Sequence, residues 1–171
     1  MDRDRVIVFS GGVEEGSVLE AIMQLLYYDS ESKTEPIYMY INSNGGNIIH
    51  GLALYDVMNH ISAPAYTICT GFAASMGAFL LSCGAKGHRA ALKHARVLIH
   101  QPLIQGDGPS WLPESQLRKQ AESLLEDRQT LEKIMAENCD KPIERLHADC
   151  ERDNWMTAEE ALAYGLIDKI V

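Results

Sequence analysis

Apolar residues along the chain form short uninterrupted runs, separated by stretches with helical spacing. The runs predict buried strands at 5–9, 37–41, 65–70 and 97–99, and the spacing predicts helices at 14–28 and 48–61. Glycine pairs at 11–12 and within 42–47 predict turns that end the first two strands. Strands that alternate with helices in this way indicate an α/β fold with a largely parallel sheet.

The second half of the chain is dominated by one long helical pattern. Apolar positions over about 114–138 predict an amphipathic helix, and Pro142 begins a shorter one. Residues 153–156 are expected to form a loop, and 157–160 have the form of a capping box at the start of a last helix. The remaining residues, 166–171, are expected to be extended. No repeat or linker interrupts this pattern, so we expect one domain over residues 1–171.

One serine stands between the third predicted strand and the helix that follows it. Small residues around Ser75 allow a sharp turn, which would place this serine at the start of the helix. The N–H groups of Met76 and Gly77 would then be unpaired and would favour a negatively charged oxygen. The pattern fits a nucleophile elbow, and it also fits an ordinary helix-capping serine, which is the commoner case.

Two further places follow strands and could carry chemistry. His100 comes directly after the strand at 97–99, and Gly46 ends the turn after the second strand. Ligands of open α/β sheets bind at this edge. Acyl transfer needs a nucleophile, a base with an orienting acid, and oxyanion donors, which Ser75, His100, an aspartate and the N–H groups of Gly46 and Met76 could supply. A half-buried histidine and a tight turn are the alternatives.

Composition narrows the classes of partner. The net charge of −9 and the pI near 5.1 argue against nucleic acid and anionic membranes as partners. No apolar run is long enough to cross a bilayer, and the start of the chain lacks a signal-peptide core. The four cysteines have no metal-type spacing, so we expect reduced thiols, a cytoplasmic location, and neither a metal nor a cofactor.

Four stretches of the chain resemble motifs of the Clp protease proteolytic subunit family. They are the serine motif at 71–81, the histidine motif at 98–103, the glycine turn at 40–46 and the C-terminal motif at 151–168. The resemblance covers nearly the whole chain, in the same order. It implies a crotonase-like α/β fold of repeated strand–helix units, with a protruding handle at about 103–138.

The resemblance also implies an activity and its residues. The family cleaves peptides and unfolded proteins as a serine endopeptidase that itself needs no ATP. Residue by residue, Ser75 matches the nucleophile, His100 the general base and Asp153 the acid that orients it. Gly46 and Met76 match the oxyanion donors.

Assembly and partners follow from the same resemblance. The family forms two stacked seven-membered rings, which receive polypeptides from an ATP-dependent AAA+ unfoldase. Glu151 and Arg152 match an ion pair that links the rings. Four residues occupy matching positions of the hydrophobic pocket where the unfoldase docks: Tyr38, Tyr40, Ile68 and Leu92.

The chain departs from the family pattern at several positions. Asn44 replaces a usual proline, His60 replaces a usual aromatic residue, and the segment 104–113 differs from the glycine-rich handle. Only residues 1–4 precede the first strand, from which we expect a wide, weakly gated pore. Two other functions remain open: an acyl-CoA enzyme of the crotonase fold, and a non-catalytic ring subunit that assembles with an active paralogue.

Overall fold

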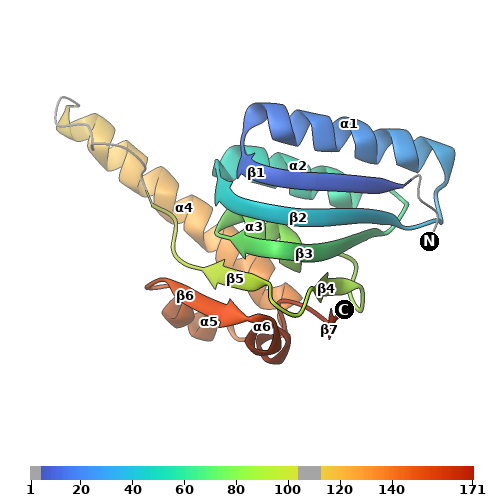
Figure 1. Ribbon diagram of the computed structural model, residues 1–171. Coiled ribbons are helices and arrows are strands. Elements are labelled where there is room, and N and C mark those ends of the chain that lie inside the picture. The colour runs from blue at the N-terminus through green and yellow to red at the C-terminus, as the bar shows by residue number, and fades with distance from the viewer. Residues whose placement is uncertain (1–4, 104–112) are drawn as a thin grey trace.

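A computed structural model describes residues 5–103 and 113–171 of the chain (Figure 1). Strands and helices alternate through its first half. The elements are β1 (Val6–Val13), α1 (Glu15–Glu31), β2 (Ile37–Gly46), α2 (Ile48–His60), β3 (Ala65–Ala74), α3 (Met76–Ser82), β4 (Arg89–Ala91), β5 (Arg96–Ile99), α4 (Glu114–Asn138), α5 (Ile143–Asp149), β6 (Asn154–Thr157), α6 (Ala158–Tyr164) and β7 (Lys169–Ile170). Residues 1–4 and 104–112 lie outside the described residues, and so does most of the segment 104–113 that departs from the family pattern.

The strands of the described chain form one largely parallel sheet. Its main path runs β1-β2-β3-β4-β7, and every neighbouring pair on that path is parallel. β5 pairs with β3 in parallel and with β6 in antiparallel orientation. The sequence-based prediction of an α/β fold with a largely parallel sheet is therefore confirmed.

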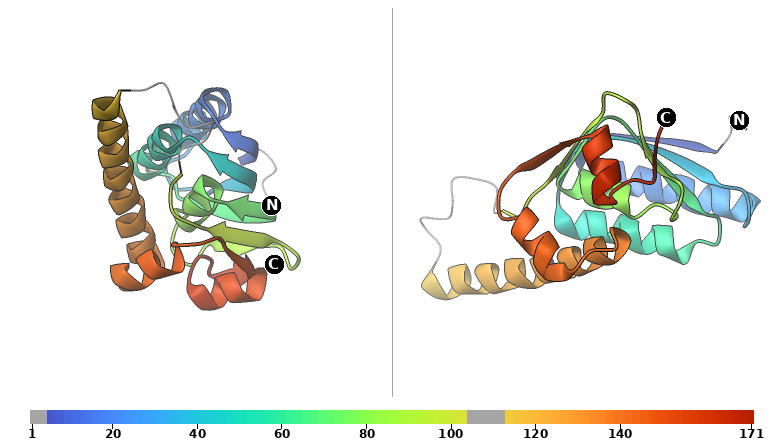
Figure 2. Two further views of the ribbon diagram at one scale, coloured as in Figure 1. Left: turned by 90° about the vertical axis from the view of Figure 1, so that its left-hand side faces the viewer. Right: turned by 90° about the horizontal axis from the view of Figure 1, so that it is seen from below.

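Helices α1 and α2 cover one face of this sheet (Figure 2). Alternation along β1 shows which face is which, because Ile7 and Phe9 are buried whereas Val8 between them is 72% exposed. Side chains of a strand point alternately to the two faces. The core therefore lies between the sheet and the helices, and the opposite face of β1 is open.

Both glycine turns predicted from the sequence are wrong. β1 continues through Gly11 and Gly12, where the register with β2 shifts, and Gly11 has a positive φ of 89°. β2 likewise continues to Gly46, and Gly45 and Gly46 pair with Gly12 and Val13. Glycine tolerates these left-handed conformations, so each glycine pair distorts a strand without ending it.

The loop predicted at 153–156 is also wrong in part. Asn154 to Thr157 form β6, whose partner is β5, with Ile99 opposite Asn154. The sequence of β6 has no alternating apolar pattern that would predict a strand. Its conformation is determined by pairing with β5 and not by its own residues. The predicted capping box is confirmed: Glu160 N–H donates to Thr157 Oγ1 at 3.2 Å, and Thr157 N–H donates to Glu160 Oε2 at 2.8 Å.

The long helix α4 has the predicted bounds and projects from the body of the molecule (Figure 1). Its C-terminal half packs on the core through Leu131 and Met135, both at least nine-tenths buried. Its N-terminal half leaves apolar side chains in solvent, with Leu117 41% and Leu125 57% exposed. The protruding helix expected from the resemblance is therefore present.

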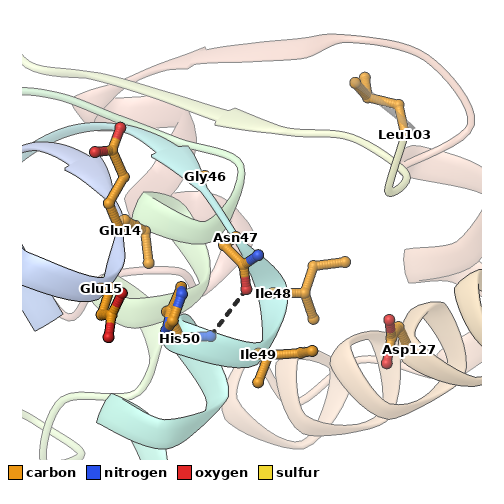
Figure 3. A pocket seen from close by; sticks show the side chains of 10 residues that line it. Glu14, Glu15, Gly46, Asn47, Ile48, Ile49, His50, Leu103 and Asp127 are labelled. Atoms are coloured by element: carbon orange, nitrogen blue, oxygen red, sulfur yellow. Dashed lines mark hydrogen bonds between the residues drawn. The ribbon is translucent and has the colours of Figure 1, made fainter. Parts of the chain in front are cut away.

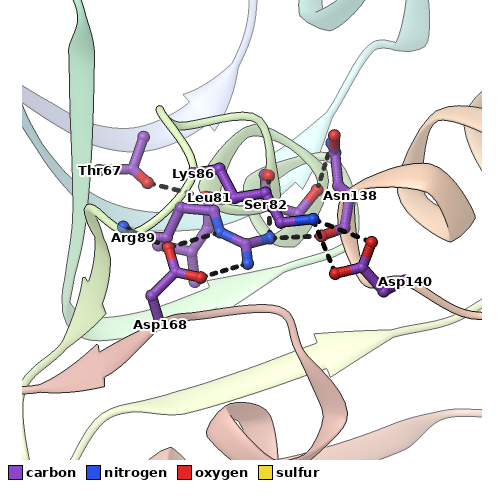
Figure 4. Close-up of polar contacts among 8 residues, drawn as sticks. All are labelled: Thr67, Leu81, Ser82, Lys86, Arg89, Asn138, Asp140 and Asp168. Carbon is purple, nitrogen blue, oxygen red and sulfur yellow. Dashed lines mark hydrogen bonds and ion pairs between the residues drawn. The ribbon is translucent and has the colours of Figure 1, made fainter.

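An ion pair joins the C-terminal segment to the core (Figure 4). Arg89 is 4% exposed and donates from Nε and Nη2 to the Asp168 carboxylate at 2.9 and 2.5 Å. The same guanidinium donates to the Asn138 carbonyl oxygen at 2.9 Å. Nearby, Lys86 pairs with Asp140 at the surface. These contacts hold β7 and the end of α4 beside β4.

Candidate active site

Ser75 occupies a strained turn between β3 and α3. Its φ of 56° and ψ of −123° lie outside the usual regions for a residue with a side chain. Its N–H donates to the Leu98 carbonyl oxygen at 2.9 Å, and its side chain makes no capping hydrogen bond to α3. Ser75 is therefore not an ordinary capping serine. Such strain costs about 1–3 kcal/mol and is concentrated at functional sites.

Gly45 makes this turn sterically possible, a role that the sequence analysis missed. A Cβ on Gly45 would lie 2.6 Å from the Ala74 carbonyl oxygen, 2.7 Å from Ser75 Cβ and 2.9 Å from Met76 N. The backbone of β2 thus touches the backbone on both sides of the serine. The glycine pair in the sequence was the available signal, but it indicated only a turn.

His100 and Asp153 lie together, just beyond the end of a strand pair. His100 follows β5 and Asp153 precedes β6, and the His100 Nδ1 to Asp153 Oδ1 distance is 3.3 Å. Asp149, the other acid near the end of the chain, accepts hydrogen bonds from the Tyr164 hydroxyl at 2.9 Å and from Arg145 Nε at 2.8 Å. The imidazole of His100 therefore has Asp153 as its neighbouring acid, and Asp149 is engaged elsewhere.

Ser75, Met76 and His100 line one small cavity of about 40 Å³. Its other walls are mostly apolar, with two charged residues: Ile48, Phe79, Pro102, Arg128, Leu131, Glu132, Met135 and Cys150. Between Ser75 and His100, both within the described residues, the structure shows no hydrogen bond. Catalytic hydrogen bonds are often long before substrate binds, so the lack of a hydrogen bond between Ser75 and His100 is compatible with a nucleophile and its base.

A larger cavity of about 510 Å³ lies beside Gly46 (Figure 3). Carboxylates of Glu14, Glu15 and Asp127 line it, and Ile48 belongs to this cavity and to the smaller one. Gly46, with a φ of 152°, faces the larger cavity. The two residues predicted as oxyanion donors, Gly46 and Met76, thus line two cavities that share the wall at Ile48.

Cysteine chemistry does not compete with the serine in this site. Cys150 lines the small cavity, and burial raises the pKa of its thiol to about 12. Burial likewise raises the pKa of Cys69 and Cys139 to about 11 and that of Cys83 to about 12. All four remain free cysteines. Thiolates are the reactive form, so these residues are inert near neutral pH.

The residues matched to partner contacts lie away from the two cavities or at their margin. Glu151 forms an ion pair with Arg128 of the same chain at 2.7 Å, and Arg152 is exposed. The four residues matched to the docking pocket are Tyr38, Tyr40, Ile68 and Leu92. Tyr38 and Tyr40 point to one face of β2, and Tyr40 is in register with Ile68 of β3. Leu92, 39% exposed, directly follows β4.

Within residues 5–103 and 113–171, no group of three or more His, Cys, Asp or Glu side chains is arranged to hold a metal ion. Among the helices of these same ranges, none is both long and apolar enough to span a membrane.

Comparisons with known proteins extend the similarity to the whole chain. A family model described as Clp protease matches residues 1–171. Three proteins named "ATP-dependent Clp protease proteolytic subunit", from Streptococcus pneumoniae strains Hungary19A-6, TIGR4 and R6, are each 46% identical to it over 169 residues. The alignments cover 99% of this chain and 85% of each relative.

Proposed function

Because this chain belongs to the Clp protease family, we propose that it is a proteolytic subunit that hydrolyses peptide bonds of unfolded polypeptides by serine catalysis. The observation that carries the proposal is the strained Ser75, which shares a cavity with His100, itself 3.3 Å from Asp153. Strain at this one residue has no structural purpose in a helix cap. It is explained by a hydroxyl that has to face a substrate.

The proposed reaction begins with proton transfer from Ser75 Oγ. The Nδ1 atom of His100 faces Asp153, which leaves Nε2 as the base that takes this proton while Oγ attacks the substrate carbonyl carbon. Backbone N–H groups of Met76 and Gly46 stabilise the oxyanion of the tetrahedral intermediate. Its collapse breaks the C–N bond, and the imidazolium gives its proton to the leaving amine. Water, deprotonated by the same imidazole, then releases the acyl group and restores Ser75.

Further proposals concern the state in which the subunit works. We infer an oligomeric protease that acts together with a Clp ATPase, built as two stacked heptameric rings of a single-domain chain in the cytoplasm. The exposed apolar side chains at the N-terminal half of α4, Leu117 and Leu125, support a handle at about 103–138 that is covered on assembly. Arg152 is proposed to join the rings, and the open sheet face with Tyr38 and Tyr40 to receive the ATPase.

Two alternatives are disfavoured by the same site. An acyl-CoA enzyme would need oxyanion donors but neither a strained serine nor a histidine–aspartate pair beside it. A non-catalytic ring subunit would not need the contact between His100 and Asp153. Neither alternative accounts for three polar residues from separate parts of the chain that meet at one place.

A fluorophosphonate probe tests the proposal. It should label the purified protein covalently at Ser75, and the protein should hydrolyse a short fluorogenic peptide without ATP. The Ser75→Ala variant should assemble as the parent does, but lose labelling and lose hydrolysis by several orders of magnitude, because the attacking oxygen is gone. Peptide hydrolysis by Ser75→Ala at the parent rate would refute the assignment. Thioester turnover without labelling would favour the acyl-CoA alternative.

A further inference from the structure

The catalytic base and its acid lie just outside the strand pair that carries them. The last paired residues of β5 and β6 are Ile99 and Asn154. His100 and Asp153 are the next residues outward on each strand, where the ladder no longer fixes the distance between the two chains. Some other set of contacts has to hold the 3.3 Å spacing of their side chains.

Gln101, the residue after His100, provides the first of these contacts. Its N–H donates to the Cys150 carbonyl oxygen at 2.6 Å, and its side-chain Nε2 donates to the Glu151 carbonyl oxygen at 2.8 Å. Both acceptors lie two or three residues before Asp153. One glutamine thus ties the segment of the base to the segment of the acid.

Arg128 of α4 holds this glutamine and the acid segment together. Its Nη1 donates to Gln101 Oε1 at 3.0 Å, and its Nη2 donates to Glu151 Oε1 at 2.7 Å. The side chain of Arg128 is only 12% exposed, although the next two residues of the helix, Gln129 and Thr130, are exposed. A planar guanidinium can hold several acceptors in fixed directions at once, which an ammonium cannot.

The guanidinium is itself held in place from behind. Arg128 Nε donates to Glu132 Oε1 at 2.6 Å, and the other oxygen of this carboxylate lies 2.9 Å from His147 Nδ1. Glu132 is only 6% exposed. Its carboxylate therefore has a fixed orientation, which in turn fixes the direction in which the planar guanidinium of Arg128 points.

We propose that Arg128 is a positioning residue, which sets the distance between His100 and Asp153 by holding Gln101 and Glu151 on α4. The inference rests on the proposed function, because it assigns Arg128 a role in the same serine catalysis. Arg128 does not touch the reacting atoms in this role. It lines the small cavity, but it acts through the two segments that carry the base and the acid.

The test compares substitutions at two arginines, each of which donates from Nε to a carboxylate four residues later in its own helix. Arg128→Met removes the guanidinium but keeps a long apolar side chain. Arg145→Met is the matched control, because Arg145 on α5 forms such a pair with Asp149 but keeps 68% of its side chain in solvent. Arg128→Lys is the conservative variant, which can reach one acceptor but not all three. Each variant is measured for kcat and KM on a short peptide, fluorophosphonate labelling rate, and particle size by light scattering.

Arg128→Met should lower kcat and the labelling rate together by about 10- to 100-fold, since small displacements of catalytic groups have effects of this size. KM and particle size should stay near the parent values, Arg128→Lys should recover part of the lost rate, and Arg145→Met should match the parent. A parent-like kcat in Arg128→Met overturns the inference, and so does a loss that appears only with a changed particle size.

A second variant covers the case in which Arg128→Met does not fold. Gln101→Leu cuts the same link from its other end and leaves the Arg128–Glu132 pair intact, and it should show the same fall in kcat with unchanged KM. An unaltered kcat in Gln101→Leu overturns the inference while the proposed function stands. A parent protein that neither hydrolyses peptide nor reacts with the probe overturns the proposed function, and this inference with it.

Discussion

At the scale of single residues, the site depends on backbone conformations that side-chain chemistry alone does not reveal. Ser75 has a positive φ of 56°, and Gly45 has a positive φ of 86° directly beside it. From the sequence, the serine motif and the histidine motif predicted two residues of the candidate site, Ser75 and His100. That position 45 requires a residue without a side chain follows only from the structure, in which β2 continues through Gly45 and lies against the Ser75 turn.

The contact at Gly45 leads to a prediction with a matched control. Gly45→Ala and Gly11→Ala both place a side chain at a positive φ, which costs roughly 1–2 kcal/mol of stability in each. Only at Gly45 would the new Cβ collide with the backbone around Ser75, because a Cβ at Gly11 has no atom within 4 Å. Gly45→Ala should therefore lower the fluorophosphonate labelling rate by about 100-fold or more, while Gly11→Ala labels as the parent does. Equal labelling of the two variants would contradict this account.

At the scale of helices and strands, periodicity predicted those elements that bury a continuous apolar face. The helix at 114–138 was predicted with its observed bounds, and the first three strands were located correctly but were too short. The errors fall where pairing with another strand decides the conformation, at Gly11–Gly12, at the end of β2 and at β6. Such pairing depends on residues far away in the sequence, so no local pattern contains it.

The capping box of α6 gives a prediction at this scale. Thr157→Ala removes the side chain that accepts the Glu160 N–H, and should lower the free energy of unfolding by about 1 kcal/mol, or the melting temperature by about 2–4 °C. Thr130→Ala is the same substitution at an exposed position in the interior of α4. It should leave the melting temperature unchanged or raise it slightly, because alanine favours helix interiors.

Differential scanning calorimetry at one fixed protein concentration is the appropriate measurement for this pair, since assembly makes the melting temperature depend on concentration. A drop of equal size in both variants would show that the loss comes from threonine itself and not from its position at the cap.

At the scale of the whole molecule, long-range polar contacts connect parts that no motif connects. Arg128 meets Gln101 across 27 residues and Glu151 across 23 residues. Arg89 meets Asp168 across 79 residues. In the sequence alone, Arg128 is one of many charged residues on a predicted helix, and such residues are usually exposed to solvent. For this reason His100 and Asp153 were predicted from their motifs, but Arg128, which contacts the segments of both, was not.

The pair of Arg89 and Asp168 predicts how stability depends on pH. Burial acts to raise the pKa of Asp168, but the hydrogen bonds and charge of Arg89 outweigh it and hold this pKa below its usual range. A folded-state pKa below the unfolded value stabilises the fold above the unfolded pKa, near 4, and this contribution disappears as pH falls through the lower folded value. Asp168→Asn should lower the free energy of unfolding at pH 7 by about 3–5 kcal/mol, since it leaves Arg89 buried without its counter-ion. It should also flatten the decline of stability below pH 4.

Asp140→Asn is the control for this prediction. Asp140 pairs with Lys86 at the surface, where both side chains are more than half exposed, so its replacement should change stability little at pH 7. Urea unfolding followed by circular dichroism from pH 2.5 to 7 measures both variants. If the free energy of unfolding of Asp168→Asn falls below pH 4 in parallel with that of the parent, Asp168 does not contribute to acid unfolding.

The same pair has a consequence for the order of events during synthesis on the ribosome. Arg89 is made 79 residues before Asp168. At elongation rates of roughly 5–20 residues per second, a nascent chain therefore waits about 4–16 s between the two. Through that interval β1, β2 and β3 can already associate, whereas β4 exposes the edge that β7 will later occupy, next to a guanidinium with no counter-ion. An unpaired strand edge is a template for contact with other chains. The growing polypeptide thus presents this edge of β4 to other chains and to nascent-chain chaperones in the seconds before β7 is translated.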